Sequence, residues 1–290
     1  MKKPITLSLI LITTLSFAQP LNRYFERANG TIHLLGHVTL ERLQQEPFGE
    51  WYQENHSEYE VSVKDLEGVS LPDSITIFMG TWCGDSRREV PRFIKMLEKH
   101  DYDLSQLRII CLNTGFQNYK QAPEREERGQ SIHRVPTFIF QEKDGTEIGR
   151  IVEEPVVTLE ADTKAILSGE VYSTYYPVVA DLLKKFDQYS LKELRKMSSK
   201  LADQYKSQAV SEYELNTYGY VLWSSWDLMK AEFVFELNTK MFPDKVSVYR
   251  SLASIKETLG QKKEVIAIAK KGLALDPEDE RLKSISSGGK

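Results

Sequence analysis

The stretch from 79 to 93, MGTWCGDSRREVPRF, contains the residue best suited to chemistry, a cysteine at the start of an expected helix. The unpaired backbone N–H groups and the positive end of the helix dipole both stabilise the thiolate form of a cysteine in that position. The thiolate is the nucleophile in sulfur chemistry. We therefore expect Cys83 to attack disulfides or other electrophilic sulfur.

The other cysteine of the chain, Cys111, lies in the apolar run LRIICLN, which is typical of a buried strand. It is either a small buried hydrophobic residue or a resolving partner for Cys83. The five histidines have no zinc-binding spacing with either cysteine. We predict neither a metal site nor a cofactor.

The elements that must position Cys83 follow a regular pattern. Short apolar, β-branched runs predict buried strands, and apolar residues at helical spacing predict helices. The residues Asp144 and Gly145 indicate a hairpin turn, and Thr158 is a candidate N-cap. The expected order is strand 74–80, helix 86–100, strand 107–113, a polar loop, strand 135–140, strand 147–152 and helix 158–167. This order predicts an α/β fold with a central mixed sheet flanked by helices.

Strand signals end after 169, and helical periodicity takes over. Ser190 is expected to open the second helix of this region. Two segments then end in a similar way, at Pro243 and at Pro277. Their spacing of about 34 residues is the period of a tetratricopeptide repeat.

Residues 74 to 168 resemble the thioredoxin family. The resemblance rests on Trp82-Cys83-Gly84 at a strand-to-helix junction, on Pro91 in the following helix, and on Val135-Pro136-Thr137 before a hairpin. It implies that Pro136 is cis and that the backbone of Val135 pairs with a peptide substrate. It also implies that Trp82, Gly84 and Asp85 line the binding surface.

Two departures from that family concern the second half of its redox cycle. Ser86 stands where dithiol members carry the resolving cysteine, and its hydroxyl can hydrogen-bond to the neighbouring thiolate. Ile77 stands where many members place a buried acid. Asp85 favours the helix dipole but opposes a nearby thiolate, so it is either a moderator of Cys83 or an ordinary helix-start residue. A polar insertion, 114–133, lies beside the expected site.

The C-terminal region resembles tetratricopeptide repeats, in which pairs of helices form grooves that bind peptides. The match is carried by Gly219, Ala231, Phe235 and Pro243, and the second unit matches less closely. The alternative is a packing extension or a dimer surface. The expected organisation is a signal peptide (1–18), an N-terminal extension that packs on the thioredoxin-like domain (19–73), that domain (74–169), a helical linker (170–209), tetratricopeptide-like repeats (210–283) and a disordered tail (284–290).

The first residues, MKKPITLSLILITTLSFAQ, have two lysines, an apolar run and small residues before an expected cleavage site after Ala18. This pattern predicts a secretory signal peptide, and therefore an exported protein, periplasmic in a Gram-negative cell, with no integral membrane segment after cleavage. The 38 Lys and Arg and 42 Asp and Glu residues are mixed throughout and form no basic stripe, so we predict no nucleic-acid binding.

Two functions follow from these features. The first is an exported thiol oxidoreductase that acts on protein disulfides through Cys83, with Ser86 beside it. Its partners would be protein or peptide clients with cysteines and an external thiol or redox partner that resolves the mixed disulfide. The second is a non-catalytic protein-binding or scaffold protein of the cell envelope. Peroxide reduction is disfavoured, because Gly80 stands where peroxidases of this fold carry Thr or Ser.

Overall fold

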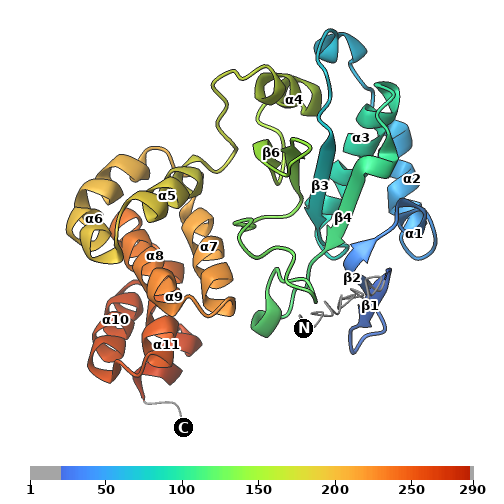
Figure 1. The fold of residues 1–290 in the computed structure, drawn as a ribbon. Coiled ribbons are helices and arrows are strands. Elements are labelled where there is room, and N and C mark those ends of the chain that lie inside the picture. Colours follow the sequence, from blue (N-terminus) through green and yellow to red (C-terminus); the bar gives the residue numbers. More distant parts are fainter. Residues whose placement is uncertain (1–20, 288–290) are drawn as a thin grey trace, which may run out of the picture.

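The computed structural model describes residues 21–287, which form a mixed sheet with helices and a C-terminal helical region (Figure 1). Six strands pair in the order β1-β2-β4-β3-β5-β6. Their bounds are β1 (Arg23–Glu26), β2 (Ile32–Val38), β3 (Ser74–Met79), β4 (Leu107–Cys111), β5 (Thr137–Gln141) and β6 (Glu147–Val152). The β3–β4 pair is parallel and the other neighbouring pairs are antiparallel.

The helices fall into two groups. The sheet region contains α1 (Leu40–Leu43), α2 (Gly49–Glu58), α3 (Gly84–Lys99) and α4 (Leu159–Leu167), with three short 3₁₀ helices, η1 (Val63–Leu66), η2 (Leu104–Gln106) and η3 (Phe116–Asn118). The C-terminal region contains α5 (Pro177–Gln188), α6 (Leu191–Lys206), α7 (Glu212–Ser224), α8 (Leu228–Met241), α9 (Val246–Thr258), α10 (Lys262–Leu275) and α11 (Glu280–Ser286). The predicted strand and helix order from 74 to 167 is confirmed, as are the N-caps at Thr158 and Ser190.

Strand β3 is buried on both faces because its side chains alternate between two separate apolar clusters. Ile77 and Met79 belong to the cluster that α2, α3 and α4 cover. Phe78 belongs to a cluster on the opposite face, together with Ala122 and Ile132 from the insertion. The insertion thus covers the face of the sheet that the helices leave open.

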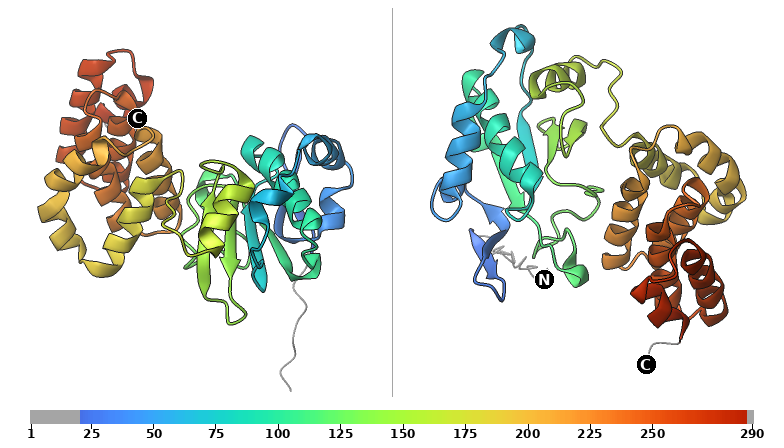
Figure 2. Two further views of the ribbon diagram at one scale, coloured as in Figure 1. Left: turned by 90° about the horizontal axis from the view of Figure 1, so that it is seen from above. Right: turned by 180° about the vertical axis from the view of Figure 1, so that it is seen from behind.

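The insertion also lies between the sheet and the C-terminal helices, as both views of Figure 2 show. The Gln121 side chain donates a hydrogen bond to the Ser224 carbonyl oxygen at 2.7 Å. The Phe116 ring meets the Trp223 ring edge-on, with 5.1 Å between centroids. The polar insertion therefore contributes to the contact between the two regions.

The N-terminal segment contributes more than the packing extension that the sequence predicted. Strand β2 pairs with β4 through Gly36, His37 and Val38, and β1 pairs with β2. The sheet therefore begins well before residue 74. The expected boundary at 74 arose because the strands before it are short and separated from β3 by helices and turns.

The four helices from α7 to α10 form two successive pairs that pack closely. In the first pair, Gly219 of α7 lies against Phe235 of α8, and a Cβ atom at Gly219 would lie 2.4 Å from the ring. Phe235 is fully buried and meets the rings of Tyr220 and Trp223 edge-on. The absence of a side chain at Gly219 therefore permits this helix crossing.

The disordered tail predicted for 284–290 is wrong for its first residues. Helix α11 continues to Ser286, and its side chains Leu282 and Ile285 are buried against the α9–α10 pair. Two apolar residues three apart suffice to hold one more turn against the preceding helices.

We expect Gly219→Ala to destabilise the helical region. Alanine raises helix propensity by about 1 kcal/mol, but overpacking a buried contact costs about 1–3 kcal/mol, so the net loss of stability should reach up to ~2 kcal/mol. Thermal unfolding followed by circular dichroism would measure it. The matched control is Gly84→Ala, also in a helix, where an added Cβ meets nothing within 4 Å. Equal melting temperatures for both variants would contradict this account of the crossing.

No helix within residues 21–287 combines the length and the apolar character needed to cross a bilayer. The predicted signal peptide at 1–18 lies outside the described residues.

Candidate functional site

Cys83 lies at the junction of β3 and α3, where the sequence predicted it, and is the N-cap residue of α3. Its backbone N–H donates to the Gly80 carbonyl oxygen at 2.9 Å, and its own carbonyl accepts from the N–H of Arg87 at 3.1 Å. The residue is partly exposed, and Gly84 beside it is exposed. The first turn of the helix thus holds the sulfur at the surface of the sheet region.

The segment around Pro136 lies directly against this sulfur. The peptide bond between Val135 and Pro136 is cis, as predicted. The Sγ atom of Cys83 lies 3.2 Å from the Val135 carbonyl oxygen, to which the thiol donates a hydrogen bond. The side chain of Val135 is buried in the cluster beneath. Fifty-two residues of chain separate the two groups, so only the fold brings them together.

Ser86 takes a different role from the expected one. Its side chain is fully buried, and its oxygen accepts a hydrogen bond from the backbone N–H of Gly80 at 3.2 Å. The hydrogen bonds of Cys83 within the described residues go to other groups. Ser86 therefore fixes the turn that precedes the cysteine.

Trp82 packs over the sheet beside the sulfur. Its indole Nε1 donates to the Leu112 carbonyl oxygen at 2.8 Å. Its ring lies so close to Gly80 that a Cβ there would be 2.5 Å from it. Trp82 and Cys83 are the partly buried members of the apolar cluster that contains Val135.

Asp85 is close enough to influence the thiol. Its Oδ2 lies 3.8 Å from the Sγ of Cys83, and its other oxygen lies 3.0 Å from Arg88. The Arg88 guanidinium also binds Glu89 and Glu154. Since Arg88 pairs with three carboxylates, its positive charge is largely compensated and has little effect on the sulfur.

We expect Asp85→Asn to make Cys83 more reactive. A unit charge at this separation is worth at least ~1 kcal/mol even in water, so the thiolate fraction near neutral pH should rise about fivefold. The measurement is the rate of iodoacetamide alkylation at Cys83, followed by mass spectrometry. Asp85→Glu, which keeps the charge, is the control. An unchanged or slower rate in Asp85→Asn would rule out a moderating role for this carboxylate.

Cys111 is in β4 with a fully buried side chain, and both cysteines are free thiols. It belongs to the cluster covered by α2, α3 and α4, whereas Cys83 packs against the cluster on the opposite face. Burial raises the pKa of the Cys111 thiol. The structure thus places it as a buried small residue, separated from Cys83 by the sheet.

A polar cluster that the sequence did not reveal ties the Pro136 segment to the helical region. Arg134 pairs with Glu153 at 3.3 Å, and its guanidinium lies 4.5 Å from the centre of the Tyr176 ring. It also donates to the Tyr213 carbonyl oxygen at 3.0 Å. The Tyr176 hydroxyl donates to the Glu153 carboxylate. Burial raises the pKa of Glu153, an effect that Arg134 opposes.

His133 and Lys120 complete this cluster inside the protein. His133 is buried between the rings of Tyr176 and Tyr218, and burial with the nearby Lys120 lowers its pKa to about 3. Lys120 donates to the His133 carbonyl oxygen at 2.7 Å. In the sequence both residues lie in the polar insertion, where other charged residues have the same appearance, and His133 also lies three residues before Pro136.

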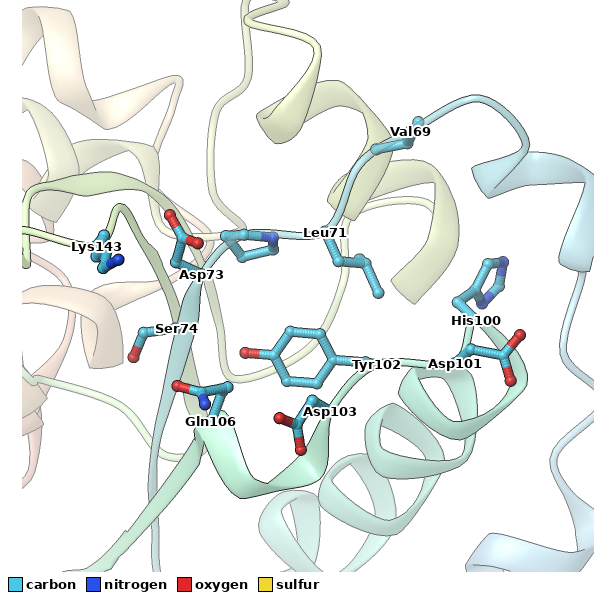
Figure 3. A pocket seen from close by; sticks show the side chains of 11 residues that line it. Val69, Leu71, Asp73, Ser74, His100, Asp101, Tyr102, Asp103, Gln106 and Lys143 are labelled. Atoms are coloured by element: carbon cyan, nitrogen blue, oxygen red, sulfur yellow. The ribbon is translucent and has the colours of Figure 1, made fainter.

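A cavity of about 790 Å³ lies away from this site. It is lined by Ser74, the first residue of β3, and by His100 at the end of α3, so it faces the opposite end of these elements from Cys83. Figure 3 shows the Tyr102 ring lying between Ser74 and Asp101. The cavity is therefore separate from the site at Cys83.

Across residues 21–287, no cluster of three or more histidine, cysteine or acidic side chains is placed to hold a metal ion. No family model, no curated protein and no solved structure compared with this chain matches it. The function has to be inferred from the site itself.

Proposed function

We propose that the chain is a thiol–disulfide oxidoreductase that acts on protein disulfides through Cys83. The single observation that carries the proposal is the position of this sulfur. It is partly exposed at the first turn of α3 and lies 3.2 Å from the backbone carbonyl of Val135. A thiolate there would be stabilised by the helix N-terminus, and a bound peptide would find the Val135 backbone beside it.

In the proposed step, the Cys83 thiolate attacks one sulfur of a client disulfide. A bond forms between Sγ and that sulfur, the client S–S bond breaks, and the other client sulfur leaves with the electron pair as a thiolate, which takes a proton from water. A second, external thiolate then attacks the mixed disulfide. It either frees Cys83 as a thiolate and stays bonded to the client, or frees the client as a thiolate and stays bonded to Cys83. Reduction of the client requires two external thiols in total.

The resemblance of residues 74 to 168 to thioredoxins supports this chemistry. The order β3-α3-β4-β5-β6-α4, the parallel β3–β4 pair and the Val135–Pro136 segment against Cys83 all agree with that resemblance. On the same basis, Trp82, Gly84 and Asp85 would line the client-binding surface. The apolar Ile77 faces the helix-covered cluster and gives no acid to assist resolution.

We further propose that the helical region is tetratricopeptide-like and binds the client protein. Its support is the two consecutive helix pairs and the close crossing at Gly219. Phe116 of the insertion and Tyr220 and Trp223 of α7 line a shallow cavity with residues of α9. An aromatic surface at this place would let a client contact both regions. The pattern of residues 1–18 leads us to propose also that the protein is exported.

The test is a reaction with an aromatic disulfide that releases a chromophoric thiol. We expect one equivalent of thiol to be released from the native protein, and mass spectrometry to find the adduct on Cys83 alone. The thiol Cys111 should react only after unfolding, because it is fully buried. Absence of the native reaction at Cys83, with both thiols reacting in denaturant, would overturn the proposal.

A scaffold or binding function is the second candidate, and one observation favours it. Pro136 and Val135 are buried, and Arg134 beside them is held by the helical region. This arrangement restricts access to the peptide-binding edge. The scaffold function predicts that Cys83→Ser binds clients as strongly as the native chain does, whereas the enzyme function predicts that covalent capture is lost.

A further inference from the structure

The backbone next to Cys83 is held by an unusual set of donors. Four successive carbonyl oxygens, from 133 to 136, each accept a hydrogen bond. The donors are Lys120 Nζ to His133 (2.7 Å), Thr137 Oγ1 to Arg134 (2.8 Å), Cys83 Sγ to Val135 (3.2 Å) and the Glu153 N–H to Pro136 (2.7 Å). Two of these four donors, the amine and the thiol, can lose a proton. Lys120 and Cys83, which can both change protonation state, therefore donate hydrogen bonds to the same short segment.

Lys120 is an unusual lysine because it is almost fully inside the protein, with 4 % of its surface exposed. Among the described residues, no carboxylate lies within ion-pair distance of its amine. Its nitrogen lies 5.0 Å from the centre of the Tyr119 ring. Buried lysines are normally paired, so one without a partner carboxylate needs another reason for its place.

The insertion holds Lys120 rigidly. Its backbone N–H donates to the Asn113 carbonyl oxygen at 2.8 Å, and the Asn113 N–H donates to Gln121 at 3.0 Å. Asn113 follows directly after the end of β4 and Leu112. These bonds tie the backbone of Lys120 to the end of β4, and the amine itself is held by the His133 carbonyl oxygen.

Burial, together with the nearby Arg134 guanidinium, lowers the pKa of Lys120 to about 7, although Glu153 and the Cys83 thiolate oppose the decrease. The amine therefore changes charge near neutral pH. The interaction with Cys83 is reciprocal, so a charged Lys120 favours the thiolate. The other charged groups near Lys120 line an adjoining cavity of about 320 Å³ and are Arg125, Glu127, Arg128, Asp187, Asp227 and Lys230. Arg125 pairs with Glu127 and Lys230 with Asp227, so these groups partly cancel.

We propose that Lys120 is a positioning residue for Cys83, which holds the 133–136 segment against the sulfur and stabilises the thiolate with its buried positive charge. This inference rests on the proposed function, since it concerns the reactivity of the same thiol. It assigns a role to the insertion, which supplies the charge from the face of the sheet opposite α3. A neutral amine can still donate to His133, so the hydrogen bond survives deprotonation while the charge does not.

The test compares alkylation rates of Cys83 by iodoacetamide from about pH 5.5 to 9 in the native chain and in Lys120→Met. Below pH 7 the native Lys120 is charged, so we expect Lys120→Met to react about three- to tenfold more slowly there. Above about pH 8.5 the native amine is neutral, and the two rates should converge. A residue with a purely structural role would change the rate by the same factor at every pH. A constant ratio of the two rates would overturn the inference.

Two further measurements keep the result interpretable. Lys120→Arg, which stays charged, should retain the native rate at low pH. In the native chain, NMR of the lysine Nζ groups should show one amine that titrates near pH 7, and Cys83→Ser should lower its midpoint. An unchanged midpoint would also overturn the inference, even if Lys120→Met did not fold. If the native Cys83 does not react with iodoacetamide or with disulfides at any pH, the proposed function itself fails. If Cys83 reacts but its rate does not depend on Lys120, only the inference about Lys120 fails.

Discussion

Cys83→Ser should abolish disulfide exchange, with the rate of chromophore release falling more than about a hundredfold, because a serine hydroxyl is not ionised near neutral pH and cannot attack sulfur. The fold should be unaffected. The residue is the N-cap of α3, a position where serine is among the preferred residues. The melting temperature should therefore stay the same or rise slightly, and this separates loss of chemistry from loss of structure.

The matched control is Cys111→Ser. Its site is fully buried in the helix-covered face, so we expect lower stability, by about 1–3 kcal/mol, from burying a hydroxyl. The exchange rate of the remaining folded protein should stay within about twofold of the native rate. A large fall in rate for Cys111→Ser at a temperature where it is folded would show that the second cysteine resolves the first.

Ser86→Cys should convert a cycle that depends on an external thiol into an intramolecular one. Both residues hydrogen-bond to Gly80. The Cys83 N–H donates to the Gly80 carbonyl oxygen, and the Gly80 N–H donates to the Ser86 hydroxyl oxygen. A thiol at 86 would thus lie one helical turn from the mixed disulfide. Because its effective concentration far exceeds that of millimolar external thiol, release of the client should accelerate by about a hundredfold or more.

The measurement is the decay of a purified mixed disulfide at increasing concentrations of added thiol. For the native chain, the decay rate should rise in proportion to the thiol concentration and approach zero without it. For Ser86→Cys, it should be fast and independent of added thiol. Ser86→Ala removes the acceptor of the Gly80 N–H without adding sulfur, so it should keep the native thiol dependence. A slow, thiol-dependent decay in Ser86→Cys would show that the buried position at 86 cannot reach the bond.

The two variants together describe how this chain differs from a dithiol protein. Cys83 lies at the helix start, while Ser86, which stands where a dithiol protein would carry its resolving cysteine, fixes the preceding turn. The segment on the other side of the sulfur is held by a lysine and by the helical region. Under the proposed function, resolution would therefore depend on a partner, and access of that partner would depend on how firmly Arg134 and Lys120 hold this segment.

Much of the local structure followed from the sequence. Apolar runs predicted β3, β4, β5 and β6 within a residue or two, and helical spacing predicted α3 to α6. Short-range signals such as Thr158, Ser190 and Gly145 were read correctly because capping and turns depend on neighbouring residues. The position of Cys83 at a helix N-cap belongs to the same class.

The tertiary structure alone decided which distant groups meet. Strand β2 joins the sheet by pairing with β4, and β1 joins it by pairing with β2, and no local pattern indicated these partners. Ser86 bonds to Gly80 rather than to the sulfur because its side chain points into the core. Lys120, His133, Arg134 and Glu153 look like surface residues in the sequence, and they are brought together because the insertion folds over one face of the sheet and under the helical region. Hydrophobic spacing is a local property that the sequence carries directly, whereas burial of a charge depends on what packs above it, which only the complete fold determines.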